Sequence, residues 1–490
     1  MSLASAISTA QTIFSNTGIQ TAIVAKNIQN AGNPDYSRRL ALMSVGSDGY
    51  TISIQRAQND ALFKQTLSYT SDASAQARLG DGLEMLRSVL GGNNYPSSPS
   101  TYIATLRTSL QTYSSSSSSL AAGATAVANA RDIANSLNAA SAAAQNLRAT
   151  ADHEIRDQVA DLNKYLSDFQ DVNNGIVGAL ATGKDASDLL DKRDNLLKSI
   201  SSIIGISTVE RQNHDTVIYS SDGAVLFETV PRKVTFSPTD NFDATVTGGA
   251  VAIDGVPVKP GSGGNTTSQG TLTALLQLRD TIAPEMQKQL DEIARGLIKT
   301  FAESDPDPAT NPVVATKAGL FQHKNSAGAA DSTVPADGIW VPGLAASIIV
   351  NPAAVADPTK LRDGGLNGPD YVSNTTGAAG YTARLDKYIT AMSTKISFDP
   401  AAGLSPETTL IDYASSSIGW LEQLRKSSAS AETTKTAMYA QSSQALSNET
   451  GVSLDEELSL MLDLEQSYKA SSRLLSAVDE MIQTLLDSVR

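Results

Sequence analysis

The sequence of 490 residues contains no cysteine and only three histidines. The absence of cysteine excludes disulfides, thiolate nucleophiles and cysteine-ligated metal sites. His153, His214 and His323 lie in three separate segments, so that neither a zinc site nor a Ser–His–Asp triad is expected. We therefore predict a protein that has no catalytic residues, no cofactor and no metal site, and that is not an enzyme.

Long apolar runs and basic stretches are also missing. No run is long enough to span a bilayer, and no lysine or arginine precedes Lys26, so that neither a membrane helix nor a Sec-type signal peptide is predicted. The chain carries 37 basic and 51 acidic residues, for a formal charge of −14, which argues against nucleic acid or an anionic membrane as a partner. If the protein leaves the cell, its export route must read an uncleaved N-terminus.

What the sequence does contain is a heptad pattern at each end. A mainly apolar stripe that includes Thr17 and Thr21 recurs at alternating steps of four and three from Leu3 to Ile28, and a seven-residue repeat runs from Leu454 to Val489. One such stripe would fit an ordinary core helix, but a stripe at each end predicts that the ends pair, because packing supplies most of a helix's stability. The predicted seam comprises Leu3, Ile7, Phe14, Val24, Ile28, Leu454, Leu458, Met461, Tyr468, Leu475, Ile482 and Val489.

A proline-centred turn, within "NAGNPDYSRR", follows the first stripe. Pro34 lacks a backbone donor and biases Asn33 away from the helical region, and Asn-Pro-Asp suits the first three positions of a type I turn. We therefore expect the N-terminal helix to end near Asn30. The predicted turn motif comprises Asn30, Asn33, Pro34, Asp35, Tyr36, Ser37 and Arg38.

Between the two ends, helical stretches alternate with β-rich or irregular ones. We predict a mainly α fold with β-rich insertions, in which terminal coiled-coil helices and a long helical bundle shaft carry outer β or irregular domains. The expected order is an N-terminal coiled-coil segment (1–35), helical shaft (36–205), β-rich domain (206–270), return helix (271–303), variable outer domain (304–403), helical shaft (404–450) and C-terminal coiled-coil segment (451–490). Because residues 304–403 lack a strong period, we expect a short linker to replace 306–402 without loss of function.

One apparent phosphate-binding motif does not fit that function. "GALATGKD" (178–185) has the glycine and lysine spacing of a phosphate-binding loop, but Asp185 stands where a magnesium-binding hydroxyl is required. The preceding residues indicate a helix, whereas the motif requires a strand. We predict a helix-to-helix connector at this point.

Four blocks together resemble a known family. "NIQNAGNPDYSRR", "SDLLDKRDNLLKSISSIIGISTVER" (187–211), "GTLTALLQLRDTIAPEMQKQLDEIARGL" (270–297) and the C-terminal segment 451–489 are similar, in order, to segments of the flagellar hook-associated protein 1 family, a branch of the rod and hook axial proteins. Two departures are Asp35, where the family usually has glycine, and Glu465, where it often has glutamine. Residues 304–403 match nothing in that family.

The resemblance implies a structural protein of the hook–filament junction outside the cell. It implies export through the flagellar type III channel without a cleaved signal peptide, after binding of an export chaperone at the C-terminal region. The implied partners are further copies of the chain in a ring, the hook protein and a second hook–filament junction protein. It also implies that Arg38 and Arg39 meet acids of a neighbouring subunit.

Two alternatives remain open at this stage. A rod or hook protein would share the Asn-Pro turn but usually lacks the block at 187–211. A secreted coiled-coil adhesin would need a receptor-binding domain, of which the central region shows no sign.

Overall fold

The structure, a computed structural model, describes residues 3–46, 49–306 and 314–488. The prediction of a mainly α fold with β insertions is confirmed, since long helices separate five small sheets of two or three strands in this part of the chain. Among the described residues, no helix combines the length and the apolar character that a membrane crossing requires.

The chain divides into two compact units, which we call the terminal unit and the central unit. The terminal unit comprises Met1–Ala73, Asp161–Lys233 and Lys435–Arg490, and the central unit comprises Ser74–Ala160 and Val234–Thr434. Three long helices contribute residues to both: α2 (Asp60–Val89), α4 (Leu120–Ala181) and α12 (Leu410–Thr450).

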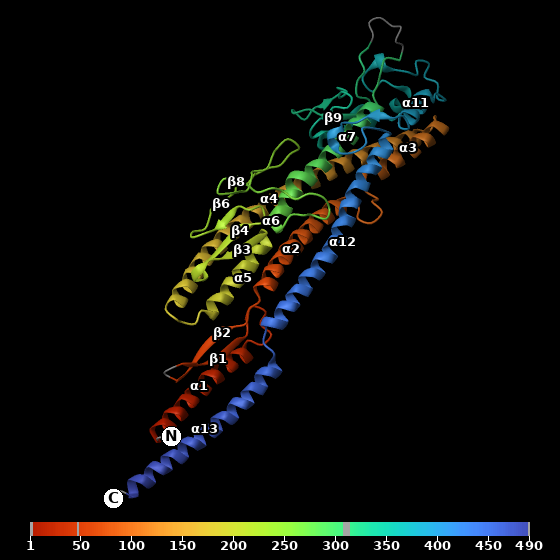
Figure 1. The fold of residues 1–490 in the computed structure, drawn as a ribbon. Helices are drawn as coiled ribbons and strands as arrows, with labels where there is room; N and C mark the ends of the chain where they lie inside the picture. Colours follow the sequence, from red (N-terminus) through yellow and green to blue (C-terminus); the bar gives the residue numbers. More distant parts are fainter. Residues whose placement is uncertain (1–2, 47–48, 307–313, 489–490) are drawn as a thin grey trace. The chain divides into compact units, whose positions relative to one another are not determined.

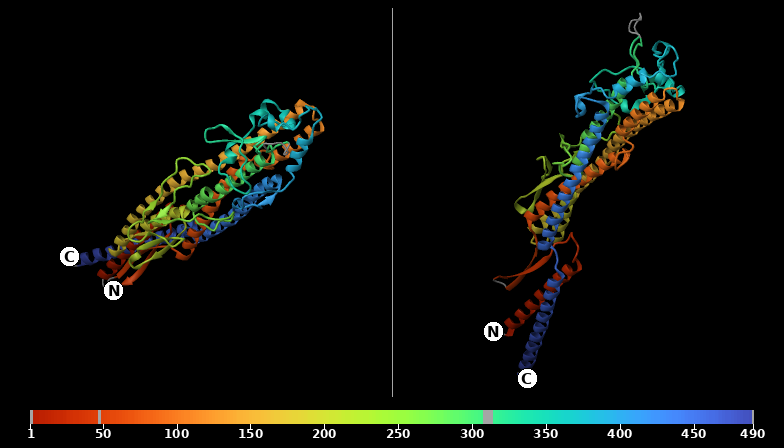
Figure 2. Two further views of the ribbon diagram at one scale, coloured as in Figure 1. Left: turned by 90° about the horizontal axis from the view of Figure 1, so that it is seen from above. Right: turned by 90° about the vertical axis from the view of Figure 1, so that its right-hand side faces the viewer.

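In the terminal unit, the first and last helices lie side by side (Figures 1 and 2). Its other elements include two antiparallel sheets, a hairpin and the three-stranded β3-β4-β5. The elements confined to this unit are α1 (Leu3–Gln29), β1 (Arg39–Gly46), β2 (Gly49–Arg56), α5 (Ser187–Ile203), β3 (Ile206–Glu210), β4 (Thr216–Ser220), β5 (Val225–Phe227) and α13 (Leu454–Ser488).

The hairpin of β1 and β2 was missed in the sequence, where residues 39–56 were assigned to a helical shaft. Its register pairs Arg39 with Arg56 and Met43 with Ile52. Alternating residues such as Ala41, Met43, Ile52 and Ile54 therefore share one face. This period-2 pattern was the available signal, and the strong helical patterns on both sides obscured it.

The central unit is built around one apolar core that the helices share with the irregular segments. The predicted β-rich segment 206–270 is divided, because only its second half belongs here. The elements confined to this unit are α3 (Pro99–Ser115), β6 (Val234–Thr235), β7 (Ala252–Ile253), β8 (Val256–Pro257), α6 (Thr271–Gln277), a π-helical turn (Leu278–Ile282), α7 (Ala283–Thr300), β9 (Phe321–Lys324), β10 (Ala330–Asp331), α8 (Leu344–Ser347), β11 (Ile348–Val350), α9 (Pro352–Ala356), α10 (Lys360–Asp363), α11 (Ala383–Ala391), β12 (Ile396–Ser397) and β13 (Glu407–Thr408).

Residues 314–402 pack into the core of the central unit, which argues against the expectation that a short linker can replace 306–402. The rings of Phe301, Phe321 and Tyr388 pack together, with centroid distances of 5.3 Å from Phe301 to Phe321 and 4.9 Å from Phe301 to Tyr388. The buried Glu303 carboxylate accepts hydrogen bonds from the backbone of residues 365–367 and from Arg384 Nη2 at 2.9 Å. Removing the segment would expose this apolar surface and leave a buried carboxylate without partners.

A second buried carboxylate, that of Asp291 on α7, has a raised pKa and stays protonated to a higher pH than an exposed aspartate. Its Oδ2 accepts hydrogen bonds from Trp340 Nε1 at 3.0 Å and from the Gly343 amide at 2.9 Å. Burial nevertheless outweighs these donors and raises the pKa of Asp291 to about 6. Because the folded state favours the protonated acid, this group's contribution to stability is full below about pH 4 and is lost as the pH rises through about 6.

We expect the fluorescence of Trp340 to report this titration. Its emission should change with a midpoint near pH 6, the pKa of the carboxyl that its indole contacts. Asp291→Asn should abolish the transition, while Trp420, the other tryptophan, provides the pH-independent background. Emission that stays constant between pH 4.5 and 7.5, or a transition that survives in Asp291→Asn, would contradict the assignment.

Candidate functional site

The two terminal helices bury rows of residues that repeat every seven positions. On α1 the row is Ala10, Thr17 and Val24, and on α13 it is Glu457, Leu464, Ser471 and Val478. The rings of Phe14 and Tyr468 contact each other with centroids 4.7 Å apart. The pairing of α1 with α13 therefore follows a heptad geometry, although three of the seven buried positions on the seam, Thr17, Glu457 and Ser471, are polar side chains.

The predicted seam residues occupy different environments on these helices. Val24 is buried, whereas Phe14, Leu454, Leu458 and Tyr468 are exposed. Leu3 begins α1, but its side chain lies outside the described residues, as does the whole of Val489. The half-buried members are Ile7, Ile28, Met461, Leu475 and Ile482.

The sequence analysis missed a second apolar row on α13. Leu460, Leu474 and Met481 share one heptad position next to the buried row, and all three side chains are exposed. These exposed side chains leave apolar surface uncovered within the described part of the chain. We name these three residues the outer row.

The turn after α1 is held by its own side chains. α1 ends at Gln29, next to the expected end near Asn30, and Gly32 follows with a φ of +82°. The Tyr36 amide donates to the Asn33 carbonyl at 3.2 Å, which closes a four-residue turn around Pro34. The Asp35 amide donates to Asn33 Oδ1 at 3.1 Å.

Asn27, which the sequence analysis did not select, is the centre of this region. Its Nδ2 donates to Glu457 Oε2 at 3.1 Å and to the Arg39 carbonyl at 2.9 Å, and its Oδ1 accepts from Tyr36 Oη at 2.8 Å and from the Arg39 amide at 3.1 Å. All four hydrogen-bonding positions of the amide are thus filled. Burial raises the pKa of Tyr36 to about 12, so that its hydroxyl remains a donor at neutral pH.

Arg38 connects the turn to the start of α13. Its Nε donates to Glu457 Oε1 at 2.7 Å and its Nη1 donates to Glu456 Oε2 at 2.6 Å. The Arg38 amide also donates to the Thr450 carbonyl at 2.8 Å. Glu457 therefore receives hydrogen bonds from both Asn27 and Arg38, at a site where its side chain is only 1% exposed.

Arg39 and Arg56 connect the hairpin to α5. Arg39 Nη2 lies 2.5 Å from Asp188 Oδ1 and 3.1 Å from Asp191 Oδ2, and Arg56 contacts Asp191 at 2.7 Å and Asp194 at 2.5 Å. The three acids recur every three residues in "SDLLDKRD", which places them on neighbouring parts of the helix surface. We call these five residues the arginine–aspartate cluster.

Lys26 of α1 adds a further cation to this cluster. Its Nζ lies 2.9 Å from Asp188 Oδ2. Burial opposes ionisation of Asp188, but the hydrogen bonds from Lys26 and Arg39 outweigh it and hold the pKa of this carboxyl below its usual value.

Arg38 and Arg39, which the resemblance placed opposite acids of a neighbouring subunit, both have acidic partners within this chain. The turn brings these two arginines next to α13 and α5. Sequence spacing alone could not reveal this, since Arg38 and Glu457 are 419 residues apart.

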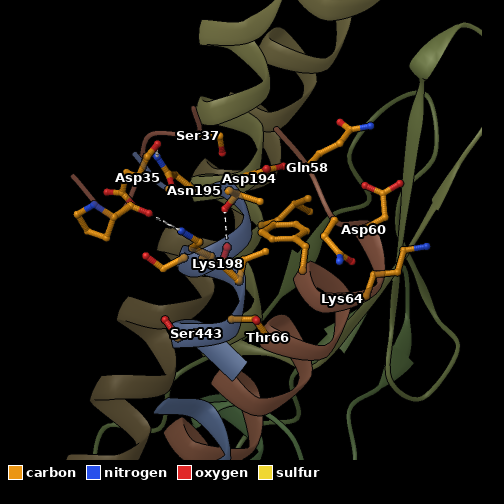
Figure 3. A pocket seen from close by; sticks show the side chains of 18 of the residues that line it. Asp35, Ser37, Gln58, Asp60, Lys64, Thr66, Asp194, Asn195, Lys198 and Ser443 are labelled. Atoms are coloured by element: carbon orange, nitrogen blue, oxygen red, sulfur yellow. Dashed lines mark hydrogen bonds and ion pairs between the residues drawn. The ribbon is translucent and has the colours of Figure 1, made fainter. Parts of the chain in front are cut away.

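A cleft of about 520 Å³ lies beside the turn (Figure 3). Its walls come from the turn at 33–37, the end of β2 with the first turns of α2, the middle of α5, the β3–β4 hairpin and the last turns of α12. The lining combines acids and bases, such as Asp35 and Lys198, with apolar side chains such as Phe63. Within the described residues no group of three or more metal-ligating side chains is present.

Comparisons with known proteins point to one family. Residues 84–305 match the family model described as the flagellar hook-associated protein FlgK helical domain, and residues 443–488 match the model of the flagellar basal body rod FlgEFG protein C-terminal. Flagellar hook-associated protein 1 of Bacillus subtilis (strain 168) is 23% identical over 407 residues, which cover 78% of this chain and 74% of that protein.

A solved structure supports the same fold. The flagellar hook junction protein FlgK from Burkholderia pseudomallei superposes with a TM-score of 0.54 at 14% sequence identity, over 78% of this chain and 99% of that chain.

We expect Glu457→Gln to loosen the packing of α1 on α13. Loss of the charge removes the buried acceptor shared by Arg38 and Asn27, whose donors then face a neutral amide, a change that typically costs about 1–3 kcal/mol. Amide hydrogen exchange in residues 454–482 of the full chain should therefore become much faster.

The adjacent Glu456→Gln is the matched control. Its side chain is 62% exposed and contacts the same arginine, so that its loss should cost no more than about 1 kcal/mol. Equal exchange rates in the two variants would show that burial of Glu457 does not stabilise the helix pair.

Proposed function

Because this chain belongs to the flagellar hook-associated protein 1 family, we propose that it is a structural component of the bacterial flagellum that connects the hook to the flagellin filament. Membership of a structural family argues against enzymatic activity. The 84–305 match favours this function over that of a rod or hook protein, whose C-terminal model covers residues 443–488 only.

The observation that carries the proposal is the state of the chain's two ends. α1 and α13 pair with each other through a joint of buried hydrogen bonds and ion pairs, yet α13 still exposes Leu460, Leu474 and Met481 at one heptad position. Exposed apolar rows on a soluble chain mark interaction surfaces. We infer that the outer row packs against neighbouring copies, so that the chain assembles as a ring-forming homo-oligomer through coiled-coil contacts of its ends.

The remaining steps of this function follow from the same ends. We propose that the chain is exported through the flagellar type III channel without a cleaved signal peptide, after an export chaperone has bound its C-terminal region. Outside the cell it would contact the hook protein on one side and a second hook–filament junction protein on the other. The predicted seam and turn motif would serve this assembly.

A rod or hook position is the second candidate, supported by the rod-type match at residues 443–488. Electron microscopy of flagella with a label on this chain separates the two. Label at the hook–filament junction supports the proposal, whereas label along the rod or hook supports the alternative. An adhesin would instead be distributed over the cell surface.

We expect Leu475→Asp to block filament growth on completed hooks. Leu475 is half-buried in the predicted seam, where an unpaired charge should cost several kcal/mol in the assembled bundle. Cells should export the variant, release flagellin into the medium and fail to swim.

Gln466→Asp provides the control, because Gln466 is exposed on the same helix and lies at the heptad position opposite the seam. Filament counts by electron microscopy and flagellin in the medium measure the outcome. Normal filaments in Leu475→Asp, or equal loss in both variants, would contradict a role of the seam in assembly.

A further inference from the structure

Two short non-helical segments, residues 57–59 and 451–453, connect the hairpin and α13 to the rest of the terminal unit, and a third, residues 30–38, joins α1 to the hairpin. Arg38 ends the third segment. Its carbonyl accepts from the amide of Ala57, and its amide donates to the carbonyl of Thr450, the last residue of α12, both at 2.8 Å. Short non-helical segments of this kind absorb most of the backbone rotation when two rigid parts of a chain move. The backbone can therefore bend at these segments.

The N-terminal end of α5 binds the hairpin strongly through acids on one helix face. Asp188 and Asp191 belong to the arginine–aspartate cluster, in which the ion-pair distances range from 2.5 to 3.1 Å. Charge-assisted hydrogen bonds of this length are the strong ones. The guanidinium of Arg39 also lies 4.7 Å from the centre of the Tyr36 ring, so that this end of the contact is fixed from several directions.

The same face of α5 holds the turn only weakly further along the helix. Lys198 Nζ lies 3.3 Å from the Pro34 carbonyl and 3.5 Å from Asp35 Oδ1, and Asn195 Nδ2 lies 3.5 Å from the Asp35 carbonyl. These distances are at the upper limit of hydrogen bonding. The turn is therefore clamped on one side and loosely held on the other.

The cleft of about 520 Å³ begins on the loosely held side (Figure 3). Beside it, the buried Oδ1 of Asn195 has no hydrogen-bond partner within the described residues. A buried acceptor without a partner costs free energy, typically about 1–3 kcal/mol. The cleft has room for the turn to move into it. Such a movement could also supply a hydrogen-bond donor to Asn195 Oδ1.

We propose that the three non-helical segments and the arginine–aspartate cluster together form a one-sided hinge within the terminal unit, which we call the joint. The arginine–aspartate cluster is the pivot, and the cleft is the clearance into which the turn at 33–37 moves. Closing the cleft tilts α1, the hairpin and α13 together relative to α5 and the end of α12, without breaking the ion pairs. The same chain can thus present its terminal helices at two angles.

The absence of cysteine makes a distance measurement direct. Nitroxide labels on Gln29→Cys and Gln441→Cys, two exposed positions at the end of α1 and on α12, report the gap across the joint by double electron–electron resonance on the full chain. We expect two distance populations. Ser443→Trp should remove the shorter one, because Ser443 lines the cleft and the indole occupies the clearance.

Asn448→Trp is the matched control, since Asn448 is exposed on the same helix and does not line the cleft; it should leave both populations unchanged. Ser447→Phe, at a second lining position, repeats the test if helical circular dichroism shows that Ser443→Trp does not fold. A single narrow distance in the parent chain overturns the hinge, as do two populations that persist in both cleft-filling variants.

The pivot has its own test. Asp191→Asn removes the acid that both Arg39 and Arg56 contact and should broaden both populations, because the clamped side then moves as well. Distance distributions of unchanged width would overturn the assignment of this cluster as the pivot.

Discussion

The buried carboxylate of Glu457 is the interaction on which the terminal unit depends. It accepts hydrogen bonds from Asn27 on α1 and from Arg38 after the turn, and it stands at the first buried position of the seam on α13. A buried charge is tolerated only when its partners are placed accurately. These contacts require that the end of α1, the turn and the start of α13 form together. They fix the alignment of α13 along α1, and the heptad packing of the two helices follows from that alignment.

The acids of α5 extend the same arrangement to the hairpin. Arg39 and Arg56 are directly opposite each other in the β1–β2 register, and both reach Asp191. Two like charges on paired strands would repel each other without these carboxylates. The block at 187–211 that resembles the family thus has a physical role in this chain, because it neutralises the base of the hairpin.

The sequence revealed the elements with strong periods and missed those whose partners are distant. The heptad stripes located α1 and α13, and the Asn-Pro-Asp sequence located the end of α1. The buried positions of Glu457 and Ser471 escaped notice because a search for apolar residues passes over polar ones, and Asn27 is unremarkable until Glu457 and Tyr36 are placed around it. Residues 304–403 misled for a related reason, because their short elements have no period of their own and are ordered by the core and the buried acids of α7 and Glu303.

The contact between Asn27 and Glu457 joins residues 430 positions apart. Loop closure over such a distance is slow compared with the formation of local structure. During synthesis, or during passage through any narrow channel with the N-terminus first, α1 must wait for nearly the whole chain before its partner arrives. The contact between α1 and the start of α13 is therefore the last part of the molecule to form. In a chain truncated anywhere before residue 457, the N-terminal helix is complete in sequence but has no Glu457 to align it with α13.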